Sequence, residues 1–157
     1  MPKPYVHAEL DSDLVGLVSR VHLRRVARAA LARAAAGRAA QLSIYVTGDA
    51  QIAKLNRRYR GIDAPTDVLS FAQGPETAGF AAPPDAADYL GDVVISYPRA
   101  KDQAVSFGHS PQDEIAILVV HGVLHLLGYD HDQVEDQERM WRIQQEVLSG
   151  LGVQWVP

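Results

Sequence analysis

The chain has 157 residues, of which 47% are hydrophobic and 22% charged, the composition of an ordinary globular protein of one domain's length. It has no cysteine, which excludes disulfide bonds and thiolate metal ligands and leaves histidine or carboxylate groups to hold any zinc ion. The net charge of −4 is unevenly divided: residues 1–60 carry 11 Lys and Arg against 4 Asp and Glu, and residues 61–157 carry 4 against 15. The basic first part could therefore form an anion-binding wall opposite a cation site in the acidic part.

We find no repeat and no domain boundary, so we expect residues 1–157 to form a single domain. Residues 1–13 lack an apolar signal region, and no run approaches the roughly 20 apolar residues of a membrane span. We therefore expect a cytoplasmic protein that makes no contact with a membrane.

Strands and helices are predicted to alternate in the first half of the chain. The apolar pattern indicates a short strand, a long amphipathic helix, a second strand and a second helix, over residues 5–10, 14–36, 41–47 and 50–59. Gly37 is expected to end the first helix, and Asp49 is expected to cap the second. Three arginines of the first helix follow at four-residue steps and form one basic stripe, Arg20, Arg24 and Arg28. A solvated helix face explains this stripe as well as phosphate contact does.

The second half is predicted to contain two short strands, a long loop between them and two helices. The strands are expected at residues 66–71 and 90–97, the loop between them at 72–88, and the helices at 110–127 and 134–148. The loop is rich in Ala, Gly and Pro, and it is either a flap with a role or plain disorder. Ser110, Pro111 and Asp113 form a helix start signature, with an N-cap, a proline in the first turn and an acid at the third position.

Three of the six histidines lie in the segment HGVLHLLGYDH, which begins at His121. His121 and His125 are four residues apart, so on a helix both imidazoles leave the same face. Gly128 suits the left-handed conformation that ends a helix, and the returning chain can bring His131 to the same point. Three neutral imidazoles are the protein ligands of a catalytic zinc, although such sites accept other divalent ions. A histidine pair alone is more often surface chemistry, but the uniformly apolar residues 115–120 predict a buried helix whose histidines need a partner.

The residues around these candidate ligands limit the class of reaction that the site is expected to carry out. The spacing HxxxHxxGxxH matches the zinc ligands of metzincin proteases, but Gly122 stands where those enzymes carry the glutamate that acts as general base. A glycine cannot take a proton, so a metal-dependent site other than a protease is expected. Asp130 and Asp132 flank the third histidine. They could orient an imidazole through a hydrogen bond, or serve only as a turn residue and a helix cap.

The histidine segment, together with LNRRYRGIDAPTDVLSF at residues 55–71 and LGDVVIS at 90–96, resembles the YbeY family of bacterial endoribonucleases. The resemblance implies an α/β fold, with a small mixed sheet of about four strands flanked by helices and one buried central helix carrying two of the ligands. It implies one zinc ion per chain, held by the residues that match the family's ligands, His121, His125 and His131. It also implies that Arg60 matches the family's functionally important arginine. Expected partners are single-stranded or ribosomal RNA and the small ribosomal subunit with its proteins.

The implied activity is maturation of the 3′ end of 16S rRNA and quality control of the small subunit. Within it, His121 acts at the catalytic centre as a metal ligand, and Arg60 pairs with the negative charge that develops on the phosphate. Arg60 could instead form an ion pair with Asp63 or Asp67. Arg57 and Arg58 are expected to join Arg60 in substrate binding, as contacts to the RNA backbone.

Two other functions stay open. A non-catalytic ribosome assembly factor with a structural metal would bind RNA or ribosomes without cleaving, and a peptidase is disfavoured by Gly122. The attacking group could be a zinc-bound hydroxide or the 2′-hydroxyl of the RNA.

Overall fold

A four-stranded mixed sheet organises the part of the chain that the computed structural model describes, residues 4–36, 38–72 and 88–157. Its order is β1-β2-β4-β3, in which β1 and β4 both run parallel to β2 and β3 runs antiparallel to β4. The strands are β1 Tyr5–Leu10, β2 Gln41–Thr47, β3 Val68–Ala72 and β4 Tyr89–Ser96. The expected α/β fold with a small mixed sheet is therefore confirmed.

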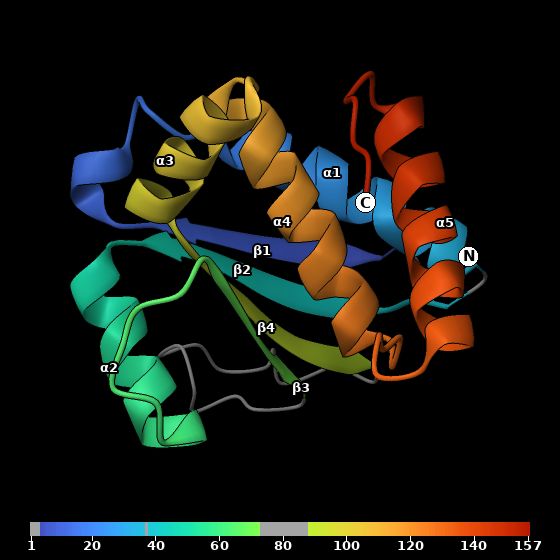
Figure 1. Ribbon diagram of the computed structural model, residues 1–157, viewed down its shortest axis with the longest axis horizontal. Helices are drawn as coiled ribbons and strands as arrows, with labels where there is room; N and C mark the ends of the chain where they lie inside the picture. The colour runs from blue at the N-terminus through green and yellow to red at the C-terminus, as the bar shows by residue number, and fades with distance from the viewer. Residues whose placement is uncertain (1–3, 37, 73–87) are drawn as a thin grey trace.

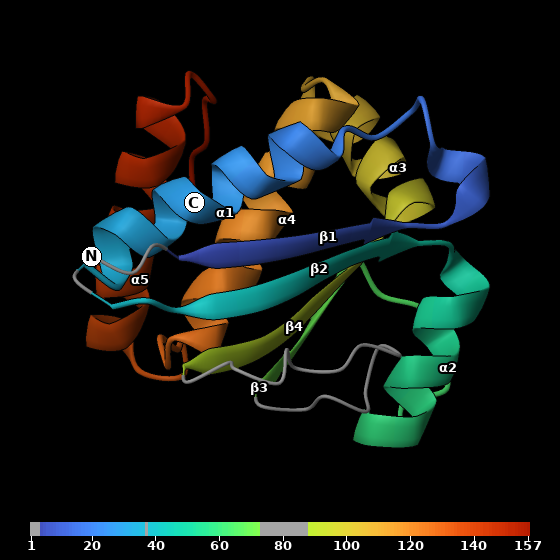
Figure 2. The same ribbon diagram turned by 180° about the vertical axis from the view of Figure 1, so that it is seen from behind.

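Helices cover both faces of this sheet (Figures 1 and 2). They are α1 Arg20–Ala34, α2 Asp49–Arg60, α3 Tyr97–Phe107, α4 Pro111–Leu126 and α5 Val134–Gly150. Neighbouring residues of β4 point to opposite faces, so Val93 joins the larger core with α1, α4 and α5, whereas Val94 joins a smaller core with α2. Within the described residues, no helix is long and apolar enough to cross a membrane.

The central helix, α4, is buried on most of its surface. Every residue from 115 to 120 is buried, and the helix packs on β3 and β4 while α1, α3 and α5 surround it (Figure 1). Its start follows the predicted signature, because the side chain of Ser110 accepts a hydrogen bond from the amide of Asp113 at 3.1 Å. The buried helix expected from the sequence is thus confirmed.

The first helix starts later than its apolar pattern predicts. Residues 12–14 form a single 3₁₀ turn, Gly16 has a φ of 94°, and α1 begins only at Arg20. Ser19 caps it by accepting a hydrogen bond from the amide of His22 at 3.1 Å. The prediction of a helix from Leu14 was wrong because a residue with positive φ interrupts the helical backbone there. The proposed stop at Gly37 lies outside the described residues.

Two further predictions are corrected around α2 and α3. The N-cap of α2 is Gly48, while Asp49 is the first helical residue, and its carboxylate accepts a hydrogen bond from Ser96 at 2.6 Å instead of capping the helix. The apolar run read as a strand to residue 97 ends at Ser96, which caps the unpredicted helix α3. That helix buries only Ala100 and Ala104, too narrow an apolar face to be recognised from the pattern. Most of the expected loop, residues 73–87, lies outside the described residues.

Candidate metal centre

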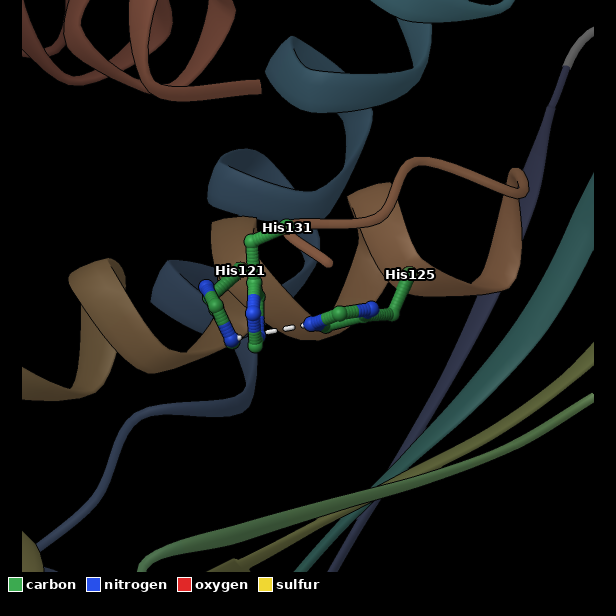
Figure 3. Close-up of side chains that lie close together, drawn as sticks. All are labelled: His121, His125 and His131. Atoms are coloured by element: carbon green, nitrogen blue, oxygen red, sulfur yellow. Dashed lines mark hydrogen bonds between the residues drawn. The ribbon is translucent and has the colours of Figure 1, made fainter. Parts of the chain in front are cut away.

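Three histidine rings converge at the end of α4 (Figure 3). His121 and His125 lie one turn apart on the helix, with their Nε2 atoms 3.1 Å apart, and His131 reaches them from the following turn. One ring nitrogen from each residue lies within 4.8 Å of the others. Two nitrogens bound tetrahedrally to zinc at about 2.05 Å lie about 3.3 Å apart, so the spacing of the helical pair fits that ion. The convergence expected from the sequence is present, as a cluster that could hold a metal.

The turn after α4 returns His131 to the cluster. Gly128 has a φ of 93°, and the amides of Gly128 and Tyr129 donate to carbonyls of the last helical turn at 3.0 Å each. Asp130 then holds the turn, because one of its carboxylate oxygens accepts from the amides of His131 at 2.6 Å and Asp132 at 3.3 Å. The backbone of His131 is therefore held in place by the Asp130 side chain.

One of the two roles expected for Asp130 and Asp132 is a hydrogen bond to an imidazole. In the described residues, neither carboxylate makes a hydrogen bond to an imidazole; Asp130 bonds to backbone amides, as in the alternative role of a turn residue. The side chain that does contact a ring is Gln144 of α5, whose Oε1 lies 3.3 Å from Nδ1 of His121. Sequence reasoning missed Gln144. Its available signal was a polar residue at a core position of an amphipathic helix.

Burial keeps the two helical histidines neutral. Desolvation lowers the pKa of His121, and the hydrogen bond with Gln144 raises it in part. Desolvation, with the nearby rings of His121 and His131, lowers the pKa of His125 to about 4. At pH 7 both rings therefore present unprotonated nitrogens, the state in which histidine binds metal ions. The donor set fits a divalent cation.

A cavity of about 450 Å³ opens in front of the cluster. The three histidines line it from α4 and the following turn, and Arg60, at the end of α2, lines it with residues of β3. The guanidinium of Arg60 donates to the carbonyl oxygen of Ser70 at 3.2 Å. Among the described residues, no carboxylate lies within ion-pair distance of this guanidinium, so Arg60 forms neither the Asp63 nor the Asp67 pair that was the alternative. The tertiary fold thus brings one arginine beside three histidines that lie at least 61 positions later in the chain.

Arg57 and Arg58 lie elsewhere on the same helix. Both are exposed, and neither lines the histidine cavity. The guanidinium carbon of Arg58 lies 5.1 Å from the centre of the Tyr59 ring, a cation–π contact. Of the three arginines expected to bind substrate, the structure therefore places only Arg60 at the cavity.

At Gly122 the helix α4 lies close against the sheet. A Cβ atom at this position would lie 2.6 Å from Cγ1 of Val93 and 3.3 Å from Oγ of Ser70. The Ser70 hydroxyl also donates to the Gly122 carbonyl at 3.2 Å and ties β3 to the helix. The position that carries the general base in HExxH proteases therefore faces the sheet here and has no room for a side chain.

The fold and this cluster define an α/β protein whose central helix presents two histidines of a three-histidine site to an arginine-lined cavity. Comparison with known proteins identifies the group to which it belongs. The family model described as "Endoribonuclease YbeY" matches residues 16–152, and the chain belongs to this family. The name denotes cleavage of internal bonds in RNA, so the family is one of RNA hydrolases.

Individual relatives agree with this assignment. The endoribonuclease YbeY of Chloroflexus aggregans is 43% identical over 149 residues, which cover 94% of this chain and 96% of the relative. The endoribonuclease YbeY of Roseiflexus sp. is 50% identical over 114 residues, covering 72% and 71% of the two chains. A solution structure of a protein from Thermotoga maritima matches with a TM-score of 0.53 at 23% identity, over 94% of this chain and 91% of that one. That likeness concerns the fold alone.

Proposed function

We propose that this protein is a zinc-dependent endoribonuclease specific for single-stranded RNA, which matures the 3′ end of 16S rRNA and takes part in quality control of the small ribosomal subunit. The observation that carries the proposal is the single cavity shared by the histidine cluster and Arg60. Its curated relatives are named endoribonuclease YbeY, which supports RNA as the substrate class. One domain spanning residues 1–157 would carry the activity in the cytoplasm, on ribosomal RNA and subunit proteins, without membrane contact.

One zinc ion per chain would be held by His121, His125 and His131. The two helical residues would use Nε2, the atom that each turns toward the other. When bound, the ion would supply a Lewis acid and a water of lowered pKa. The histidines contribute fixed, neutral nitrogen donors, and the cavity in front of them leaves space for a phosphate group.

Arg60 would supply the positive charge that this cluster of neutral rings lacks. Its guanidinium is anchored to the Ser70 carbonyl through Nη2, and its other N–H groups make no hydrogen bond to the described residues, so they can bind the non-bridging oxygens of a phosphodiester. Charge on those oxygens increases toward the transition state, so the pairing would stabilise the transition state more than the bound substrate. Arg57 and Arg58, exposed on the same helix, would hold neighbouring phosphates without reading sequence.

The test compares four proteins on a labelled single-stranded RNA: the native chain, His121→Ala, Arg60→Gln and the matched control Arg142→Gln, an arginine on α5. We expect native cleavage, loss of both zinc and cleavage in His121→Ala, and retained zinc with cleavage reduced roughly 10²- to 10³-fold in Arg60→Gln. Arg142→Gln should cleave as well as the native chain, because this exposed arginine of α5 does not line the cavity. Products ending in a 5′-phosphate would indicate attack by water, and a 2′,3′-cyclic phosphate would indicate attack by the 2′-hydroxyl.

Equal cleavage by the native chain and His121→Ala would contradict the proposal and point to another site or a contaminating nuclease. If no protein cleaves while the native chain holds one zinc and binds small subunits, the assembly factor with a structural metal becomes the better explanation.

A further inference from the structure

A buried amide side chain lies directly behind the histidine cluster. Gln144 of α5 is only 2% exposed, and its helix neighbours Ile143, Val147 and Leu148 are buried apolar residues. Placing an amide in such surroundings is unfavourable unless it is hydrogen-bonded. The Gln144 Oε1 atom lies 3.3 Å from Nδ1 of His121, the residue that packs at the α4–α5 contact. The buried amide therefore faces one specific atom of a candidate metal ligand.

The two nitrogens of the His121 ring have different neighbours. Nε2 lies 3.1 Å from Nε2 of His125 and belongs to the side where the three rings meet (Figure 3). Nδ1 lies on the side of Gln144. A neutral imidazole carries one proton, and a nitrogen that binds metal must carry none. An amide oxygen beside Nδ1 can only accept a hydrogen bond, so it favours the proton on Nδ1 and leaves Nε2 free.

We propose that Gln144 is a positioning residue that selects the Nδ1–H tautomer of His121 and thereby presents the Nε2 lone pair to a divalent cation. The inference rests on the metal site of the proposed function and adds the residue that prepares that site. The ring of His125 has a different neighbour, the backbone of Tyr129, which partly offsets the lowering of its pKa. Among the described residues, Gln144 is thus the side chain outside the cluster at which the tautomer of a candidate ligand can be altered by substitution.

The test uses three variants. Gln144→Met keeps an unbranched side chain of similar length but removes the acceptor, and Gln144→Glu keeps an acceptor at the same place. Gln145→Met is the matched control, because the adjacent glutamine on the same helix is exposed. Nitrogen NMR of ¹⁵N-histidine-labelled, metal-free protein reports the tautomer of His121, competition with a chelating dye reports zinc affinity, and thermal unfolding checks the fold.

We expect the native protein, Gln144→Glu and Gln145→Met to show the Nδ1–H tautomer, and we expect both variants to bind zinc at least as tightly as the native chain. Gln144→Met should show a mixture of tautomers and a zinc affinity lower by roughly 10- to 100-fold. An Nε2–H tautomer in the native protein would overturn the proposal without any variant. Unchanged tautomer and zinc affinity in folded Gln144→Met would overturn it as well, as would an equal loss of affinity in Gln144→Glu.

These measurements do not involve RNA. A protein that cleaves no RNA would refute the proposed function and leave the tautomer result intact. A protein that cleaves RNA but shows the wrong tautomer would refute only the role of Gln144.

Discussion

The two helical histidines of the cluster and the third histidine, on the turn, are supported in different ways. His121 and His125 stand on a helix that is buried on most sides, and each ring has a second contact, to Gln144 and to the Tyr129 backbone. His131 is exposed on the turn that follows, where the Asp130 carboxylate holds its amide and its ring lies beside those of His121 and His125. The rings of the helical pair are thus held by buried neighbours, whereas the exposed side chain of His131 has more conformational freedom to lose when a ligand binds. Groups that are already held in place lose less conformational entropy on binding, so they bind a ligand more tightly.

The largest effect should come from removing a helical ligand. We expect His121→Ala to reduce the zinc content from about one ion per chain to background, because the most buried ring of the cluster is lost. Metal analysis after dialysis measures this, and His109→Ala, outside the cluster, is the control. Retention of stoichiometric zinc by His121→Ala would place the metal elsewhere.

Removing the turn histidine should cost less. Ordering an exposed side chain and its turn takes about 1–2 kcal/mol from the energy of the new bond, so His131→Ala should bind zinc about tenfold more tightly than His121→Ala. Competition with a chelator on both variants, in the same buffer, makes the comparison. Equal affinities would mean that the turn is as well ordered as the helix before the metal binds.

The close approach of Gly122 to Val93 provides the third test. Gly→Ala inside a helix normally stabilises it, but Gly122→Ala should lower the free energy of unfolding by about 1–3 kcal/mol, because its Cβ would meet the stiff Val93 side chain at 2.6 Å. The control is Gly150→Ala at the end of α5, where a Cβ meets nothing within 4 Å and should stabilise by up to about 1 kcal/mol. Urea unfolding measures both. Stabilisation by Gly122→Ala would show that α4 can move away from the sheet.

The last test concerns the pH dependence of stability. Because the pKa of His125 is about 4 in the folded chain and 6.5 in the reference state, the unfolded chain binds protons first as the pH falls. The metal-free protein should therefore lose stability between pH 6.5 and about 4, and His125→Gln should flatten this part of the curve. Urea midpoints across the range measure it. An unaltered slope in His125→Gln would assign the loss to other groups.

The sequence alone specified the features that depend on local spacing. A four-residue interval and a buried apolar run place His121 and His125 on one face of α4, and Gly128 allows the reversal toward His131. Strands β1 and β2 were predicted with their observed bounds. Each of these features follows from the periodicity of a helix or strand, or from the conformational freedom of a single glycine.

Only the tertiary structure decided which distant residues meet. Arg60 reaches the cavity because α2 ends beside β3, and Gln144 reaches His121 because α5 packs on α4. The sequence identified Gly122 as a missing base, but the reason that no side chain fits there is its contact with Val93 on another element. Helical and strand periods describe which face a residue occupies and not what packs against that face, so contacts between elements depend on the completed fold.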